Sequence, residues 1–192
     1  MKNLILTFIL TLAIMDLNAQ ETSVLIKVTN KKLGDYWIEV ADRNCGVQSN
    51  GINSYGKYYT WSDGENSKDR KTPDAAAKAC KEFQGGGHTD WRLPIIEEVW
   101  ALMRECKTHS TYASLQNKRG DTAGIIYFPY AGIIDPETNE TIELNQRGYF
   151  WTAYGKGGSA IGVALELANG VTNNPGIPKK SKLSVRCVRT VK

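Results

Sequence analysis

Features on which catalysis usually depends are scarce or missing in this sequence of 192 residues. There are only two histidines, and neither belongs to a His-Glu-x-x-His zinc motif. No phosphate-binding loop, dinucleotide fingerprint or Gly-x-Ser-x-Gly nucleophile elbow occurs. Glu97 and Glu98 are adjacent and would point in different directions on a helix, so they do not form an acid and base pair. These absences favour a protein that is not an enzyme and needs no cofactor.

Charge of one sign is not concentrated anywhere in the chain. The formal net charge of +4 comes from 24 Lys and Arg against 20 Asp and Glu. These residues are spread along the sequence with a mild basic bias near the C-terminus, whereas a nucleic-acid-binding protein usually carries a dense basic patch. The hydrophobic fraction of 41% excludes a wholly disordered chain. The composition therefore indicates a globular domain without a nucleic-acid partner.

Long apolar runs are missing after the N-terminus. Residues 1–19 contain Lys2, an apolar run over residues 4–15 and the small residue Ala19 before a polar one, an arrangement typical of a secretory signal peptide. The run is shorter than the ~20 residues that a membrane helix needs, which makes a membrane anchor the weaker alternative. We predict that residues 1–19 are removed and that the mature chain has no membrane span. The expected location is the periplasm, the cell surface or the medium.

Closely spaced cysteine pairs are absent as well. Cys45, Cys80, Cys106 and Cys187 include no Cys-x-x-Cys pair, which argues against a zinc module. An even number of cysteines in an exported chain favours two disulfides, with free buried thiols as the next alternative. Four cysteines allow three pairings, and their spacing does not choose among them.

The sequence does contain two helix patterns set among strand patterns. Thr72 as N-cap, Pro73 at the first position and three closing glycines predict a helix over residues 75–83. Apolar residues at helical spacing predict a second helix over residues 95–107. A hairpin turn is expected at residues 169–170. Strands are expected where β-branched and aromatic residues gather, over residues 24–29, 35–41, 58–61, 125–130, 148–154, 161–167 and 183–191.

Three groups of segments, in this order, resemble one family. The first contains Tyr-Trp-Ile-Glu-Val-Ala-Asp-Arg-Asn at residues 36–44 and a Tyr-rich run at 55–61. The second is Trp-Arg-Leu-Pro at residues 91–94, and the third combines Gly-Tyr-Phe-Trp-Thr at 148–152 with Ser-Val-Arg-Cys-Val-Arg at 184–189. Residues 35–192 thus resemble the FISUMP family, the major paralogous domain of exported bacterial proteins, and are similar to the C-terminal domain of bacterial collagen-like adhesins. Residues 20–34 would then be an N-terminal strand and linker.

The resemblance implies an α+β, C-type-lectin-like fold. In this fold two helices flank twisted antiparallel sheets, and long loops precede the last strands. It also implies a disulfide between Cys80 in the first helix and Cys187 in the last strand, which leaves Cys45 to pair with Cys106. Ile95 departs from the family pattern, in which a Thr or Ser at this position caps the second helix.

The resemblance further implies roles for individual side chains. Three are expected in the structural core: Trp91, Arg92 and Trp151. The long loops would carry the ligand, because their Asn, Gly, Tyr and Lys side chains suit hydrogen bonding and aromatic stacking. The side chains expected to bind it are Tyr154, Lys156, Asn169, Asn173, Asn174 and Lys179. Tyr55 and Tyr130 are further candidates for stacking. The calcium-binding motifs of true C-type lectins are missing, so no metal is expected.

These expectations combine into a non-catalytic binding domain. It would act in adhesion or in the recognition of a glycan or a host surface protein. The alternative is a structural subunit of a surface or fimbrial assembly, whose partners would be other subunits. An enzyme of unknown type is the third and weakest interpretation.

Overall fold

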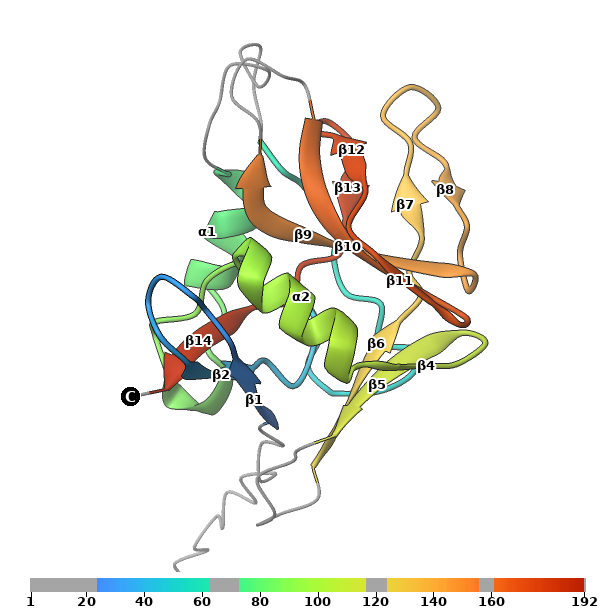
Figure 1. Ribbon diagram of the computed structural model, residues 1–192. Helices are drawn as coiled ribbons and strands as arrows, with labels where there is room; N and C mark the ends of the chain where they lie inside the picture. The colour runs from blue at the N-terminus through green and yellow to red at the C-terminus, as the bar shows by residue number, and fades with distance from the viewer. Residues whose placement is uncertain (1–23, 63–72, 117–123, 156–160, 192) are drawn as a thin grey trace, which may run out of the picture.

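Four small antiparallel sheets and two short α-helices make up the described part of the chain (Figure 1). The computed structural model describes residues 24–62, 73–116, 124–155 and 161–191. The expected C-type-lectin-like layout is wrong, because the chain is mostly β and its two helices do not flank a common sheet system. The sequence patterns missed six strands, most of them only two or three residues long. Such short strands are too brief for an alternating pattern to be visible.

The first sheet joins the two ends of the described chain. It contains β1 (Val24–Val28), β2 (Tyr36–Val40) and β14 (Val188–Val191), with β2 in the centre. Alternate residues of β1 are buried, as expected for a strand with one face on the core. The turn between β1 and β2 is closed by Asn30, whose Oδ1 accepts the N–H groups of Lys32 and Leu33 at 2.9 Å each.

The longest strands form the second sheet. It contains β9 (Arg147–Gly155), β10 (Ile161–Ala168), β11 (Val171–Asn173) and β12 (Gly176–Pro178). β10 pairs with all three of the others. The predicted hairpin turn after β10 is confirmed, with Gly170 at a φ of 72°. Nearly continuous burial along β9 and β10 shows that this sheet is covered on both faces.

The remaining two sheets are built from shorter strands. One contains β3 (Tyr59–Thr60), β13 (Lys182–Leu183), β7 (Ile133–Ile134) and β8 (Thr141–Ile142). The other contains β4 (Lys107–Thr108), β5 (Tyr112–Gln116) and β6 (Ile125–Pro129). The expected single strand over residues 183–191 is in fact divided between β13 and β14, which belong to different sheets.

The first helix, α1 (Ala75–Lys81), begins at Asp74. The Asp74 carboxylate accepts the Ala75 N–H at 2.7 Å and so fills the capping role predicted for Thr72, which lies outside the described residues. A short 3₁₀ turn, η2 (Gly85–Gly87), follows the helix. α1 packs against β3.

The second helix, α2 (Ile96–Glu105), packs against β1 and β9. Ile95 has no side-chain oxygen with which to cap the helix. Instead the Glu98 carboxylate accepts the Ile95 N–H at 2.9 Å. No helix in the described residues has the length and apolar character needed to cross a membrane.

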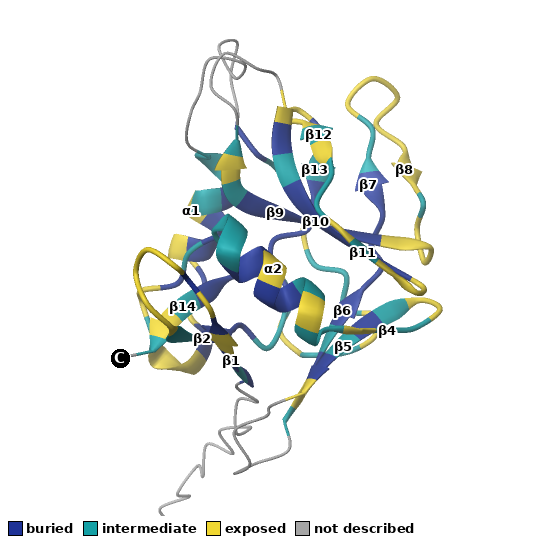
Figure 2. Ribbon diagram, viewed as in Figure 1, coloured by how far each residue is buried: buried dark blue, intermediate teal, exposed yellow. Residues whose placement is uncertain are grey.

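The segments that carry the family resemblance supply part of the buried interior, which is dark blue in Figure 2. Trp91 and Trp151 are 4% and 0% exposed, as the resemblance implied for core residues, whereas Arg92 is half-buried. The backbone of Arg92 exchanges hydrogen bonds with that of Val188 at 2.9 and 2.8 Å. The backbone N–H of Trp151 donates to the Ser184 carbonyl at 3.1 Å. These motifs therefore hold the sheets together.

Candidate functional site

The structure does not bring the predicted ligand-binding residues together. Tyr154 precedes Gly155, which pairs with one end of β10, and Asn169 follows the other end. The eight residues of β10, with a rise of ~3.3 Å per residue, separate the two ends by roughly 23 Å. Asn173 lies between them, opposite Glu166, and is exposed. Asn174 follows it and is half-buried, and Lys156 lies outside the described residues.

Two of the expected surface residues are buried instead. Lys179 is 1% exposed, and its ammonium lies 4.6 Å from the centre of the Trp61 ring, a cation–π contact in the core. Tyr130 is fully buried, so it offers no platform for stacking. Lys179, in a segment expected to be a loop, and Tyr130, at the end of an expected strand, thus fill the interior, and no local pattern indicated that they turn inward.

A pocket of about 280 Å³ lies elsewhere, next to Cys45. Three segments form its walls: the loop of residues 43–48 after β2, Tyr59 on β3, and residues 79–84 at the end of α1. The pocket joins segments far apart in the sequence, which is why no local motif predicted it.

Backbone hydrogen bonds fix the loop that carries Cys45. The Ala41 N–H donates to the Cys187 carbonyl at 2.9 Å, and the Cys45 N–H donates to the Val185 carbonyl at 3.0 Å. The Lys57 N–H donates to the Cys45 carbonyl at 3.0 Å. The loop is therefore held between the chain before β3 and the chain before β14.

Arg186 holds the same loop from the interior. Its guanidinium donates to the Asn44 Oδ1 at 2.9 Å, to the Ala41 carbonyl at 2.8 Å and to the Tyr127 carbonyl at 2.6 Å. It also lies over the Phe128 ring at 4.4 Å. Burial lowers the pKa of Arg186 to about 10, since the charged form loses its hydration. This arginine of the Ser-Val-Arg-Cys-Val-Arg segment is a structural residue.

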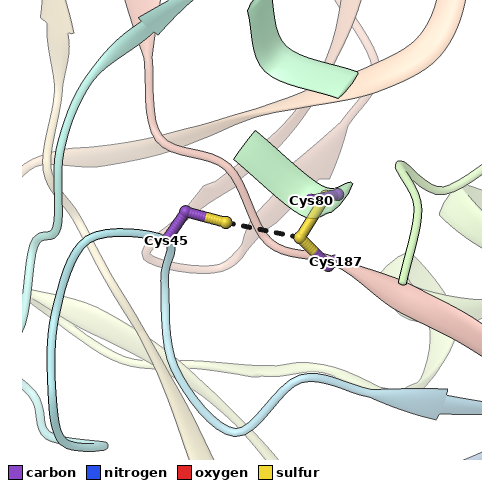
Figure 3. A group of neighbouring side chains, drawn as sticks. All are labelled: Cys45, Cys80 and Cys187. Carbon is purple, nitrogen blue, oxygen red and sulfur yellow. Dashed lines mark hydrogen bonds between the residues drawn. A yellow bond between two sulfur atoms is a disulfide. The ribbon is translucent and has the colours of Figure 1, made fainter. Parts of the chain in front are cut away.

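Cys45, which lines the pocket, belongs to a buried cluster with Cys80 and Cys187 (Figure 3). Cys80 of α1 forms the disulfide with Cys187 that the resemblance implied, with the two Cα atoms 5.6 Å apart. The free Cys45 thiol lies 3.3 Å from the Cys187 Sγ and 3.5 Å from the Ala79 carbonyl oxygen.

The implied second disulfide between Cys45 and Cys106 is not formed. Both are free cysteines. Cys106 follows α2 and packs against a different hydrophobic cluster from the one that contains Cys45. The sequence could not show this separation, because it follows from the packing of the loop after β2 and of the end of α2 against different hydrophobic clusters.

The Cys45 thiol is not activated for nucleophilic catalysis. Burial raises its pKa to about 12, although the charges of Arg186 and Arg43 act in the opposite direction. Nearly all of it is neutral at pH 7, and the thiolate is the form that attacks and binds metal. Burial also raises the pKa of the neighbouring Tyr59 hydroxyl. With Cys80 and Cys187 joined in a disulfide, the three sulfurs do not offer the thiolates that a metal site requires.

Polar side chains stand around the pocket opening. The Arg43 guanidinium forms hydrogen bonds of 2.8 and 2.9 Å with Asp42 and lies 5.1 Å from the centre of the Phe83 ring. The lining also includes the side chains of Gln48, Glu82 and Gln84, all of them exposed. Guanidinium, amide and carboxylate groups beside an aromatic ring can hydrogen-bond a polar ligand and pack against its apolar face. Comparisons of the chain with protein-family models, with curated proteins and with solved structures give no match.

Proposed function

We propose that the chain is an exported, non-catalytic binding domain that holds a small polar ligand in the pocket beside Cys45. A saccharide unit of a surface glycan is the ligand class that fits this chemistry. The observation that carries the proposal is the pocket itself. Its 280 Å³ volume lies just below the range of small-molecule sites, and its opening combines amides, a carboxylate and a guanidinium with a buried aromatic ring.

The export of the chain is supported by two independent features. Residues 1–19 have the pattern of a signal peptide, and the disulfide between Cys80 and Cys187 is of a kind that persists in oxidising compartments. The resemblance to exported bacterial domains agrees with this location and with a role in adhesion.

Binding without catalysis is supported by the titratable groups of the pocket. Its lining includes a single carboxylate, Glu82, and neither histidine. The thiol of Cys45 is held neutral by burial. A paired acid and base, or an activated nucleophile, is therefore missing from this pocket.

A glycan array followed by calorimetry on the mature protein tests the proposal. Gln48→Ala and Gln84→Ala should each weaken binding about tenfold, which corresponds to about 1.4 kcal/mol and one or two hydrogen bonds. Tyr154→Ala and Asn173→Ala are matched controls, since they change exposed side chains of the sheet around β10 and should leave the affinity unchanged. If only the control variants lose glycan binding, the binding site lies on the sheet around β10 and not in the pocket. Absence of binding to every glycan would contradict the ligand class.

A structural subunit of a surface assembly is the second candidate. It is supported by Trp100 on α2, a large apolar side chain that is 53% exposed. Trp100→Ala should then abolish the recovery of sibling subunits in a pull-down and leave glycan binding unaffected. If the unsubstituted protein and the Trp100→Ala variant recover sibling subunits equally, an assembly role for this helix is contradicted.

A further inference from the structure

The free Cys45 thiol, which lines the pocket, faces the buried disulfide between Cys80 and Cys187. The Cys45 and Cys187 Sγ atoms are 3.3 Å apart, and the sulfurs of Cys45, Cys80 and Cys187 all lie within 4.8 Å of one another (Figure 3). A disulfide bond joins sulfurs about 2.05 Å apart, so the Cys187 sulfur lies about 1.3 Å beyond bonding distance to Cys45. A small rotation of the two side chains covers such a distance. No other cysteine is needed for a change of partner.

We infer that these three cysteines hold one exchangeable disulfide, in which Cys187 is shared by Cys45 and Cys80. The deprotonated Cys45 sulfur attacks the Cys187 sulfur and forms a new bond to it. The Cys80–Cys187 bond breaks, and its electron pair leaves with the Cys80 sulfur, which takes up a proton. One disulfide and one thiol are present before and after the step. It therefore needs neither an oxidant nor a reductant.

Exchange changes which wall of the pocket is covalently linked to the segment before β14. Cys80 belongs to α1, whose end supplies Ala79 and Glu82 to the pocket, whereas Cys45 belongs to the loop on the opposite side. In one isomer a disulfide links α1 to the segment before β14. In the other isomer a disulfide links the loop of residues 43–48 to the same segment. The two isomers differ in the wall that is free to move. A ligand that prefers one isomer will shift the equilibrium toward it; this last step rests on the proposed binding function, whereas the exchange itself does not.

The surroundings of Cys45 make the exchange slow near neutral pH. The charged and titratable side chains that line the pocket with Cys45, contact its loop or act on its charge are Arg43, Lys57, Tyr59, Glu82 and Arg186; the same elements also carry Asp42, Lys78 and Lys81. Arg43 and Arg186 favour the thiolate, but burial outweighs them and raises the pKa to about 12. The thiolate fraction, and with it the exchange rate, should rise about tenfold with each pH unit below that value.

Peptide mapping without reduction tests this inference on the purified, oxidised protein. Samples kept without oxygen near pH 7 and about pH 9 are quenched in acid, unfolded, alkylated and digested. We expect a Cys45–Cys187 peptide and alkylated Cys80 in a minor fraction of roughly 0.1–10% of the chains. This fraction should be reached faster at the higher pH. Cys106→Ser is the matched control and should give the same two isomers, since Cys106 lies outside the cluster.

The Cys80→Ser variant provides a second readout. Under an excess of oxidised glutathione it should form the Cys45–Cys187 disulfide. The inference is overturned if that variant retains thiols at both positions, or if the unsubstituted protein has less than about 0.1% of the second isomer at both pH values. If the variant does not fold, the mapping of the unsubstituted protein decides alone. A protein that binds no glycan would give the same results in the peptide mapping and in the Cys80→Ser experiment. The exchange and the proposed binding function can therefore be refuted independently.

Discussion

The buried carboxylate of Glu98 should control the stability of the fold through the Trp-Arg-Leu-Pro segment. Glu98 is fully buried and receives hydrogen bonds from Arg92 at 2.6 and 2.7 Å and from the Tyr36 hydroxyl at 3.0 Å. It also accepts the Ile95 N–H at the start of α2. One side chain therefore joins the helix, the motif and β2. The perturbation we choose is Glu98→Gln, which keeps the shape and removes the charge.

The expected loss of stability depends on the partners of Glu98 that lose a charged acceptor in the Glu98→Gln protein. Removing one member of a buried ion pair usually costs about 3–5 kcal/mol. The Arg92 side chain is 38% exposed, so water can replace part of the lost interaction, and we expect the lower end, about 3 kcal/mol. For a chain of this size, 1 kcal/mol corresponds to roughly 2–4 °C, which gives a fall in Tm of about 6–12 °C.

Urea and thermal unfolding, followed by circular dichroism, measure this change. Glu97→Gln is the matched control on the same helix, and we expect it to lie within about 0.5 kcal/mol of the unsubstituted protein. A double-mutant cycle with Arg92→Gln should give a coupling of at least about 1 kcal/mol. A Glu98→Gln protein as stable as the Glu97→Gln protein would refute the reasoning.

Three further predictions concern the cysteines and the packing. Cys187→Ser removes a disulfide that spans 107 residues and should lower the free energy of unfolding by about 2–5 kcal/mol in urea titrations. Burial raises the pKa of the free thiols of Cys45 and Cys106 from 9.0 to about 12, so above pH ~9 the folded chain binds more protons than the unfolded chain, and its stability should fall as the pH rises. Stability that is constant from pH ~8 to ~9.5 would contradict these shifts. Gly155→Ala should cost about 1–3 kcal/mol in thermal unfolding, because a Cβ there would overlap the buried Trp61 ring.

Local signals in the sequence predicted local structure well. Both helices were found to within two residues at each end, and the strand patterns located β1, β2, β6, β9 and β10. Helices of two or more turns and long strands such as β9 and β10 carry enough periodicity to be recognised, although the five-residue strand β5 was missed. Most of the two- and three-residue strands carry none, and without them the arrangement of the sheets could not be predicted. For this reason the prediction of a C-type-lectin-like layout was wrong.

The candidate site could not be predicted because its chemistry depends on side chains that meet across the fold. Cys45 and Cys187 are 142 residues apart, and their proximity follows from the pairing of the loop after β2 with the segment before β14. The predicted ligand residues do not converge for a related reason. An Asn-rich hairpin and a Tyr near the end of β9 are both exposed, but β10 holds them at opposite ends. Composition alone cannot show whether exposed residues converge.

The segments of the family resemblance form the scaffold, and the opening of the pocket lies largely outside them. Arg186 binds backbone and amide oxygens in the interior, and Arg189 forms hydrogen-bonded contacts of 2.5 and 2.6 Å with Glu39. In contrast, Gln48 and Gln84 are exposed and belong to none of these motifs. Substitutions at exposed sites away from caps and cores usually change stability by less than about 0.5 kcal/mol. This scaffold should therefore accept different side chains at Gln48 and Gln84; under the binding function proposed above, its ligand preference could then change while its fold does not.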